Sequence, residues 1–208
     1  KGHFADLQAL EVVVECDRYA AYKCLAKSQA GILLAFCWAH VRRDFLDGAR
    51  SWPEWAAWMF EWVDDIRELY HLNAARLEVW NAEQPLSHQS LAFRDRQSSL
   101  VNHLTQMQTR WAAQLQDKKL PHAKRKVLTS LKNHWAGLRV FIDHPEVPLD
   151  NNAAERALRN PVIGRKNYYG SGSVWSAQLA AVMFSVLQTV LLWGLNPHHW
   201  LQVFLQAC

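Results

Sequence analysis

Two short apolar runs stand near the start of the 208-residue sequence. The first, Glu11–Cys16, is rich in β-branched residues and ends at Asp17, and the second, Ile32–Cys37, follows Gly31. Runs of this length between turn residues predict buried strands. Residues 19–27 between them have helical spacing. The pattern therefore predicts a compact strand–helix–strand unit that belongs to a larger sheet.

From residue 39 to about residue 144 the spacing of apolar residues is helical almost throughout. A break at 81–90 contains Pro85, a second long helix is expected at 91–117, and a third follows Pro121. The first helix carries one apolar stripe, made of Trp52, Trp55, Trp58 or Met59, Trp62, Ile66 and Leu69. Tryptophan can stack on nucleic-acid bases, but this helical spacing favours packing in a core.

The C-terminal stretch 167–208 contains no Asp, Glu, Lys or Arg, and Val174–Leu195 is long enough to cross a bilayer. A membrane-associated helical protein is therefore one alternative, which partition after cell lysis would test. Polar residues interrupt the stretch at helical spacing (Ser176, Gln178, Ser185, Gln188, Thr189), and no basic flank follows. We expect a buried amphipathic helix that packs on a sheet, ends at Gly194 and Asn196-Pro197, and does not cross a membrane.

Charge is unevenly distributed although the formal net charge is only +4. Between Lys118 and Lys166 there are eleven Lys or Arg against four Asp or Glu. Such a segment fits contact with a polyanion such as DNA, and a solvated helix face explains it equally well. The four cysteines show no disulfide-framework spacing, so a reducing cytoplasm is expected.

The most informative block is residues 150–171, which places Asp150 and Glu155 at the front of a helix. Pro161 is expected to stop this helix and to be followed by a basic, glycine-flanked, aromatic loop (Gly164, Arg165, Lys166, Tyr168, Tyr169, Gly170). Carboxylates beside such a loop suit a place where a metal ion and a phosphate backbone meet.

Asp17, at the end of the first apolar run, is a second candidate for metal chemistry. Two Mg²⁺ ions about 3.5–4 Å apart can activate an attacking oxygen and neutralise a leaving one, and they need a few converging carboxylates. A strand would fix the Asp17 backbone and expose its side chain at the sheet edge. An Asp in this place is more often a turn former or a helix N-cap.

Three motifs carry a resemblance to a known family. Asp-Asn-Asn-x-x-Glu-Arg at 150–156, followed by Gly-Arg-Lys-Asn at 164–167, resembles the C-terminal signature of bacterial transposases of the insertion sequence sixty-six family, which belong to the DDE class. Cys-Asp-Arg-Tyr-x-x-Tyr at 16–22 is similar to the family's Asp-Gly-Tyr-x-x-Tyr motif, with Arg18 where Gly is usual. Cys-x-x-His at 37–40, followed by an Arg-Arg pair, is the third match.

The resemblance implies roles for individual residues. Asp17 and Glu155 would be catalytic and would hold Mg²⁺ or Mn²⁺, while Asp150 or Asn151 would cap the helix that carries Glu155. Cys37 and His40 would lie close to the metal or to DNA; a buried Cys and a core His remain an alternative, and a closed zinc site lacks a second ligand pair. The implied DNA-binding residues are Arg42, Arg43, Arg156, Arg159, Arg165, Lys166 and Tyr168.

The resemblance also implies a fold and an activity. The fold is α/β, a partial ribonuclease-H-like core with few strands and a large all-α insertion, and predominantly helical overall. Its expected parts are residues 1–38 with the second catalytic Asp, a helical insertion at 39–145, and residues 146–208 with the Glu helix, the basic loop and C-terminal packing helices. The intact protein would cleave and join DNA at transposon ends and target sites, in the bacterial cytoplasm in association with the nucleoid, without a membrane.

One element of the family pattern lies outside these motifs. The family's first catalytic Asp precedes Asp17 on an earlier strand, and Asp6 is too near for a separate strand with a crossover. We therefore expect the C-terminal part of a catalytic domain, inactive alone and dependent on an N-terminal segment or on other transposase subunits. The alternative is a catalytically inactive DNA- or protein-binding remnant of a decayed insertion element.

Overall fold

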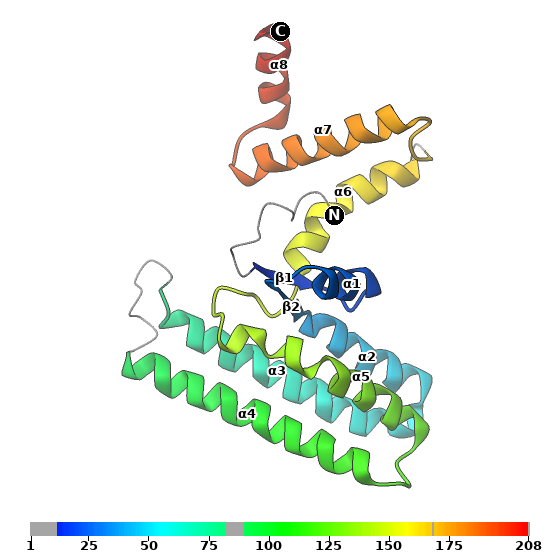
Figure 1. The fold of residues 1–208 in the computed structure, drawn as a ribbon, viewed down its shortest axis with the longest axis vertical. Helices are drawn as coiled ribbons and strands as arrows, with labels where there is room; N and C mark the ends of the chain where they lie inside the picture. The colour runs from blue at the N-terminus through cyan, green and yellow to red at the C-terminus, as the bar shows by residue number, and fades with distance from the viewer. Residues whose placement is uncertain (1–11, 82–89, 168, 208) are drawn as a thin grey trace. The chain divides into compact units, whose positions relative to one another are not determined.

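A computed structural model of the chain describes residues 12–81, 90–167 and 169–207 (Figure 1). These residues are predominantly helical and contain one small parallel sheet. The chain divides into two compact units, Lys1–Asn151 and Asn152–Cys208, and each is described by itself below.

The first unit begins with the predicted strand–helix–strand arrangement. Strands β1 (Val12–Cys16) and β2 (Ile32–Phe36) pair in parallel, with Val12 opposite Ile32 and Cys16 opposite Phe36. Helix α1 (Ala20–Ser28) connects them. Gly31 adopts φ 84°, a left-handed conformation that glycine tolerates, and its carbonyl accepts a 2.8 Å hydrogen bond from the Val12 amide. In the part of the chain that the structure describes, the sheet has these two strands and no others.

Four long helices follow the sheet and confirm the predicted helical stretch. They are α2 (Trp38–Ser51), α3 (Ala56–Glu78), α4 (Leu91–Gln116) and α5 (His122–Leu138), with short 3₁₀ turns η2 (Pro53–Trp55) and η4 (Val140–Ile142). Helices α2 and α4 each pack against both α3 and α5, so the four helices enclose one core.

Tryptophans contribute much of this core, as their spacing indicates. Trp38 and Trp62 are fully buried, and the Trp135 ring meets both Trp38 and Trp111 edge-on, with centroids 5.9 and 5.8 Å apart. Trp52 is only partly buried and stands at the end of α2. The apolar stripe therefore packs as predicted from Trp58 onward, and its first members lie at the margin of the core.

The core also buries a charged side chain, Arg76 of α3. Its guanidinium donates to the Phe141 carbonyl (3.0 Å), the Ile142 carbonyl (3.2 Å) and Oε1 of Gln97 (2.8 Å), and it stacks over the Phe93 and Phe141 rings. Burial lowers the pKa of Arg76 to about 10, so the side chain remains charged at neutral pH. Arg76 thereby fastens α3 to α4 and to η4.

The second unit contains three helices, α6 (Asn152–Asn167), α7 (Val174–Leu192) and α8 (Pro197–Ala207). Ser173 and Ser176 form a capping box at the start of α7. Gly194, with φ 72°, follows its end as predicted. Helices α7 and α8 contact each other.

Helix α7 differs from its sequence-based prediction in one respect. By length and composition it is the one described helix that could cross a membrane, and only 6% of its most apolar window is buried. Val190 is its single buried residue, while Trp175 and Leu192 are exposed. Within the second unit, taken by itself, α7 is therefore not buried as predicted, because α8 covers too little of its apolar surface.

Replacing Arg76 with Ala should destabilise the first unit by about 3 kcal/mol, because three buried acceptors lose their charged donor. Urea unfolding followed by circular dichroism measures the change. The matched control is Arg67→Ala, on the same helix, since the Arg67 side chain is exposed and its ion pair among the described residues is the one with Asp64 at 3.2 Å. Arg67→Ala should stay within about 0.5 kcal/mol of the wild type. Equal effects of the two substitutions would contradict the role assigned to Arg76.

Candidate functional site

Asp17 follows β1 directly, at the carboxyl end of the parallel sheet. Its Oδ1 accepts a 3.0 Å hydrogen bond from the Tyr19 amide, which makes Asp17 a turn former. This bond occupies one oxygen, and the other makes no hydrogen bond with any residue that the structure describes. The turn-forming role and a ligand role are therefore compatible.

Arg18, which stands where the resembling family usually has Gly, ties this turn to two helices. Its guanidinium donates to Oδ2 of Asp44 on α2 (2.5 Å), to Oγ of Ser130 on α5 (2.8 Å) and to the His40 carbonyl (3.3 Å). The Arg18 backbone does not have a positive φ, so the turn needs no glycine. The substitution adds an anchor and leaves Asp17 in place.

The segment that leads into α6 is bound to the same end of the sheet. The Leu149 carbonyl accepts a 2.8 Å hydrogen bond from the amide of Trp38, just after β2. The next residue, Asp150, accepts a 3.0 Å hydrogen bond through Oδ2 from the Tyr70 hydroxyl of α3. The last residues of the first unit thus lie beside the ends of both strands.

Glu15 of β1 adds a third acidic side chain, besides Asp17 and Asp150, to this end of the sheet. Burial, and after it the charge of Asp150, raise the pKa of Glu15 to about 7. Oε1 of Glu15 is buried and accepts no hydrogen bond from the residues that the structure describes. Burial and the nearby Asp150 also raise the pKa of Tyr70, so its hydroxyl stays protonated and donates to Asp150. Three acidic residues from two segments therefore surround the strand ends.

The sequence predicts that Asp150 or Asn151 caps the start of α6. The helix begins at Asn152, directly after Asn151. Asn151 thus occupies the N-cap position, but its buried Oδ1 accepts no hydrogen bond from a described residue. The expected side-chain cap by Asn151 is therefore wrong, because this oxygen does not reach the first amides of α6. The capping role of Asp150 stays a prediction.

Cys37 and His40 lie at the start of α2. Cys37 is buried, and burial raises the pKa of its thiol although the backbone amides of Asn151, His40 and Ala39 act in the opposite direction. Arg42 and Arg43, on the next turn, are exposed. Among the described residues no three His, Cys, Asp or Glu side chains lie close enough together to hold a metal ion. The geometry of Cys37 is that of a core residue.

Helix α6 runs through Pro161 and does not stop there, so the predicted helix end is wrong. Proline has a φ near that of a helix, so α6 accommodates it although the backbone amide is missing and the ring crowds the carbonyl four residues earlier. Gly164, Arg165 and Lys166 are accordingly helical, and the expected basic loop is the last turn of the helix.

A continuous α6 gives its charged residues defined faces. At 100° per residue Glu155, Arg159 and Lys166 fall within about 40° of one another, and Arg156 and Arg165 flank them on opposite sides. Lys166 lies about 16 Å along the axis from Glu155. One helix face therefore presents a carboxylate followed by two cations.

The end of α6 exposes an aromatic side chain. The Gly170 amide donates a 3.0 Å hydrogen bond to the Arg165 carbonyl, and Tyr169 has φ 59°, the left-handed conformation that usually selects glycine. The Tyr169 side chain is 98% exposed, so it packs in no core. Tyr168, the residue predicted to contact DNA, lies outside the described residues.

Comparisons with known proteins agree with the sequence motifs. The model of the Transposase IS66 family matches residues 2–179. The chain belongs to this family.

Similar curated proteins come from Sinorhizobium fredii (strain NBRC 101917 / NGR234). Uncharacterized protein y4jD is 28% identical over 202 residues, which cover 94% of this chain and 37% of the relative. Uncharacterized protein y4qI is 30% identical over 201 residues, 91% of this chain and 34% of the relative. The chain thus spans about a third of the length of these relatives. No solved structure matches it significantly.

The structure brings only some of the predicted site residues together. Asp17, Cys37 and His40 lie around the strand ends in the first unit, whereas Glu155 and the basic residues of α6 belong to the second. The convergence of Asp17 and Glu155 stays a prediction. Sequence reasoning missed Glu15, although strand alternation places residues 15 and 17 on the same face. No local signal marks Tyr70, since it is fifty-three residues from Asp17 in the chain.

The cysteine environments predict a simple order of reactivity. In a Cys208→Ser background the exposed Cys24 should react with a thiol reagent in the folded protein, whereas buried Cys16 and Cys37 should react only after unfolding. Burial raises the pKa of Cys16 to about 11, which suppresses its thiolate further. Titration with Ellman's reagent should count one fast thiol natively and three in guanidinium chloride. Fast labelling of Cys37, located by peptide mapping, would contradict its placement in the core.

Proposed function

We propose that the chain is the C-terminal part of the catalytic domain of a DDE transposase with a ribonuclease-H-like core. The whole protein then cleaves and joins DNA strands at transposon ends. The observation that carries the proposal is that β1, β2 and the segment leading into the Glu155 helix meet at one end of a parallel sheet, where Asp17 stands. Sites in α/β sheets form at the carboxyl ends of strands.

The side chains at the carboxyl end of the sheet are of the chemical type that binds a hard divalent cation. Neither the second oxygen of Asp17 nor the buried Oε1 of Glu15 accepts a hydrogen bond from a described residue. Carboxylate oxygens are the ligands that Mg²⁺ or Mn²⁺ takes. In this proposal Asp17 and Glu155 hold the metal, with a further carboxylate from outside residues 1–208. The metal supplies activation of the attacking oxygen and charge neutralisation at the leaving one.

The chain's own residues position the DNA. Arg159 and Lys166 share a face of α6 with Glu155 and bind phosphates of the same duplex, since their separation of about 10 Å along the helix corresponds to the rise of roughly three base pairs. Arg42 and Arg43 are exposed on α2, two and three residues beyond His40, and they bind phosphates near the strand ends. Arg156, Arg165 and Tyr168 extend the same DNA-binding surface.

The organisation of the whole protein follows from the same proposal. Residues 1–38 and 146–208 are parts of the core, residues 39–145 are an insertion, and the partners are DNA and other transposase subunits or an N-terminal segment in the bacterial cytoplasm. The rival is an inactive remnant that binds DNA or protein without cleaving it. The two differ in whether strand cleavage depends on Asp17 and Glu155.

The test of the acids uses the full-length protein that contains this chain. Asp17→Asn or Glu155→Gln should reduce Mg²⁺-dependent cleavage of transposon-end DNA by at least about a thousandfold, because a shared metal loses a ligand, and should leave DNA affinity within about threefold. Gel-based cleavage and fluorescence anisotropy measure the two effects.

The matched control for these acids is Asp150→Asn. An amide oxygen still accepts from Tyr70, so cleavage should fall by less than about tenfold. If Asp150→Asn reduced cleavage as much as Glu155→Gln does, the assignment of Glu155 and not Asp150 as the metal ligand would be wrong. Full-length protein that binds DNA and shows no Asp17-dependent cleavage would establish the remnant.

The basic face of α6 has its own test with the 208-residue chain. Arg159→Ala and Lys166→Ala should each weaken binding to duplexes of any sequence and reduce the slope of log affinity against log salt by about 1, as loss of one phosphate contact does. Anisotropy titrations at several salt concentrations measure this slope. Arg67→Ala on α3 is the matched control and should leave it unchanged. If the slope for Lys166→Ala were the same as for the wild type, Lys166 would not belong to the phosphate-binding surface.

A further inference from the structure

A pocket of about 510 Å³ opens in the first unit between α1, α2 and α5. Its volume lies in the range that encloses a small organic ligand. Arg18, which follows Asp17, lines one end of the pocket, and Trp52, at the end of α2, also lines it. The pocket therefore includes the residue that follows Asp17 in the proposed catalytic turn. Its other lining residues lie outside the family motifs.

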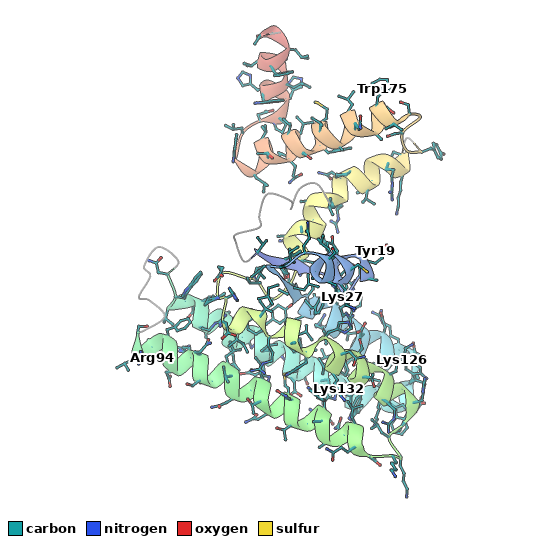
Figure 2. The ribbon with its side chains drawn as sticks, viewed as in Figure 1. Tyr19, Lys27, Arg94, Lys126, Lys132 and Trp175 are labelled. Atoms are coloured by element: carbon teal, nitrogen blue, oxygen red, sulfur yellow. The ribbon has the colours of Figure 1, made fainter. Side chains whose placement is uncertain are left out.

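Helix α5 gives the pocket a basic wall. Lys126, Ser130 and His134 recur every four residues and line it together. Lys126 is exposed and makes no ion pair with a described residue. Figure 2 labels both Lys126 and Lys132 on this helix; Lys132, which does not line the pocket, is six residues further along and on another face.

Lys23 of α1 is held in the pocket by a neutral partner. Its Nζ lies 2.7 Å from Nε2 of His134, and Nδ1 of the same ring lies 2.7 Å from the Ser130 carbonyl. Because a carbonyl only accepts, Nδ1 carries the proton and Nε2 accepts from the lysine. Burial first, and the Lys23 charge among other causes, lower the pKa of His134, so the ring stays neutral. The Lys23 charge is oriented and has no counter-ion among the described side chains.

Helix α2 supplies the opposite wall, which is acidic. Asp44 is bound by Arg18 at 2.5 Å, whereas Asp47 makes only an exposed 3.3 Å contact with Arg50. A ligand that fits both walls carries an anionic group for Lys23 and Lys126, hydrogen-bond donors for Asp47, and a flat ring for Trp52. A phosphate, a base with ring or exocyclic N–H groups, and an aromatic face occur together in a nucleotide.

We propose that this pocket binds a single nucleotide, with its phosphate at Lys23 and Lys126 and its base toward Trp52. The nucleotide can be free or can be an unpaired residue at the end of a DNA strand, which would hold that end beside Asp17. The DNA source rests on the function proposed above, whereas binding of a free nucleotide does not.

The first experiment titrates the 208-residue chain with deoxyadenosine 5′-monophosphate by isothermal calorimetry. Saturable binding is expected, and deoxyadenosine without its phosphate should bind at least about tenfold more weakly, as loss of a charge-assisted contact predicts. Lys126→Ala should weaken mononucleotide binding about tenfold, and the matched control Lys132→Ala should leave it unchanged. Both lysines are exposed, so neither substitution threatens the fold.

A second variant blocks the pocket. Ser51 is exposed and lines the pocket, so Ser51→Trp should fill it and abolish binding while the circular dichroism spectrum stays native. Absence of saturable mononucleotide binding, or equal effects of Lys126→Ala and Lys132→Ala, would overturn the proposal.

The source of the nucleotide is distinguished by competition. If a strand end is the ligand, a single-stranded oligonucleotide with an unpaired end should displace the mononucleotide, and a blunt, hairpin-closed duplex should not. If neither DNA competes, the pocket binds the free nucleotide only. None of these measurements depends on DNA cleavage. The pocket proposal can therefore be refuted while the catalytic proposal holds, and the catalytic proposal can be refuted while the pocket proposal holds.

Discussion

The first unit depends on how Trp38 is bound where β2 ends and α2 begins. Its amide donates to the Leu149 carbonyl, its indole nitrogen donates to the Leu138 carbonyl at 2.8 Å, and its ring packs edge-on against Trp135. About a hundred residues of helix leave the sheet after Trp38 and return at Leu149. Closing this long segment costs chain entropy, but the cost grows only slowly with the length of the segment. The fully buried Trp38 side chain and its two donated hydrogen bonds hold the segment closed at this point. The helical excursion is thereby anchored at the same point as the strand ends.

This closure brings like charges together. Glu15 and Asp150 interact at the carboxyl end of the sheet, where Asp17 follows β1, and burial together with the charge of Asp150 raises the pKa of Glu15 to about 7. Such an arrangement lowers stability at neutral pH unless a cation or a proton compensates. Arg18 does not compensate it, because its guanidinium is directed to Asp44, Ser130 and the His40 carbonyl. Buried groups that lower local stability in this way are typical of functional sites.

Local patterns predicted the elements of this fold better than the contacts between them. The β-branched runs, the spacing of Trp58 and Trp62, and Gly194 after α7 each reflect a preference that a few neighbouring residues determine. The apolar stripe of α3 also continues at helical spacing to Arg76, but the charge of Arg76 concealed its place in the core. The contact of Tyr70 with Asp150 joins residues eighty positions apart, and only the packing of α3 against the sheet end creates it. The exposure of α7 was missed because its composition resembles that of a core helix.

The continuity of α6 through Pro161 changes what its residues can do. In a loop, Arg165 and Lys166 would have sampled many positions relative to Glu155, and binding a phosphate would have had to overcome that freedom. On one helix, Glu155, Arg159 and Lys166 keep fixed spacings on a common face, so under the proposed function the backbone is already ordered when DNA binds. Pro161 has no amide to donate to the carbonyl four residues earlier, and any bend of the helix is expected there, between Arg159 and Lys166. The distance from Glu155 to Arg159 is therefore the more rigid of the two, and Arg159 is the better suited to place a phosphate relative to Glu155.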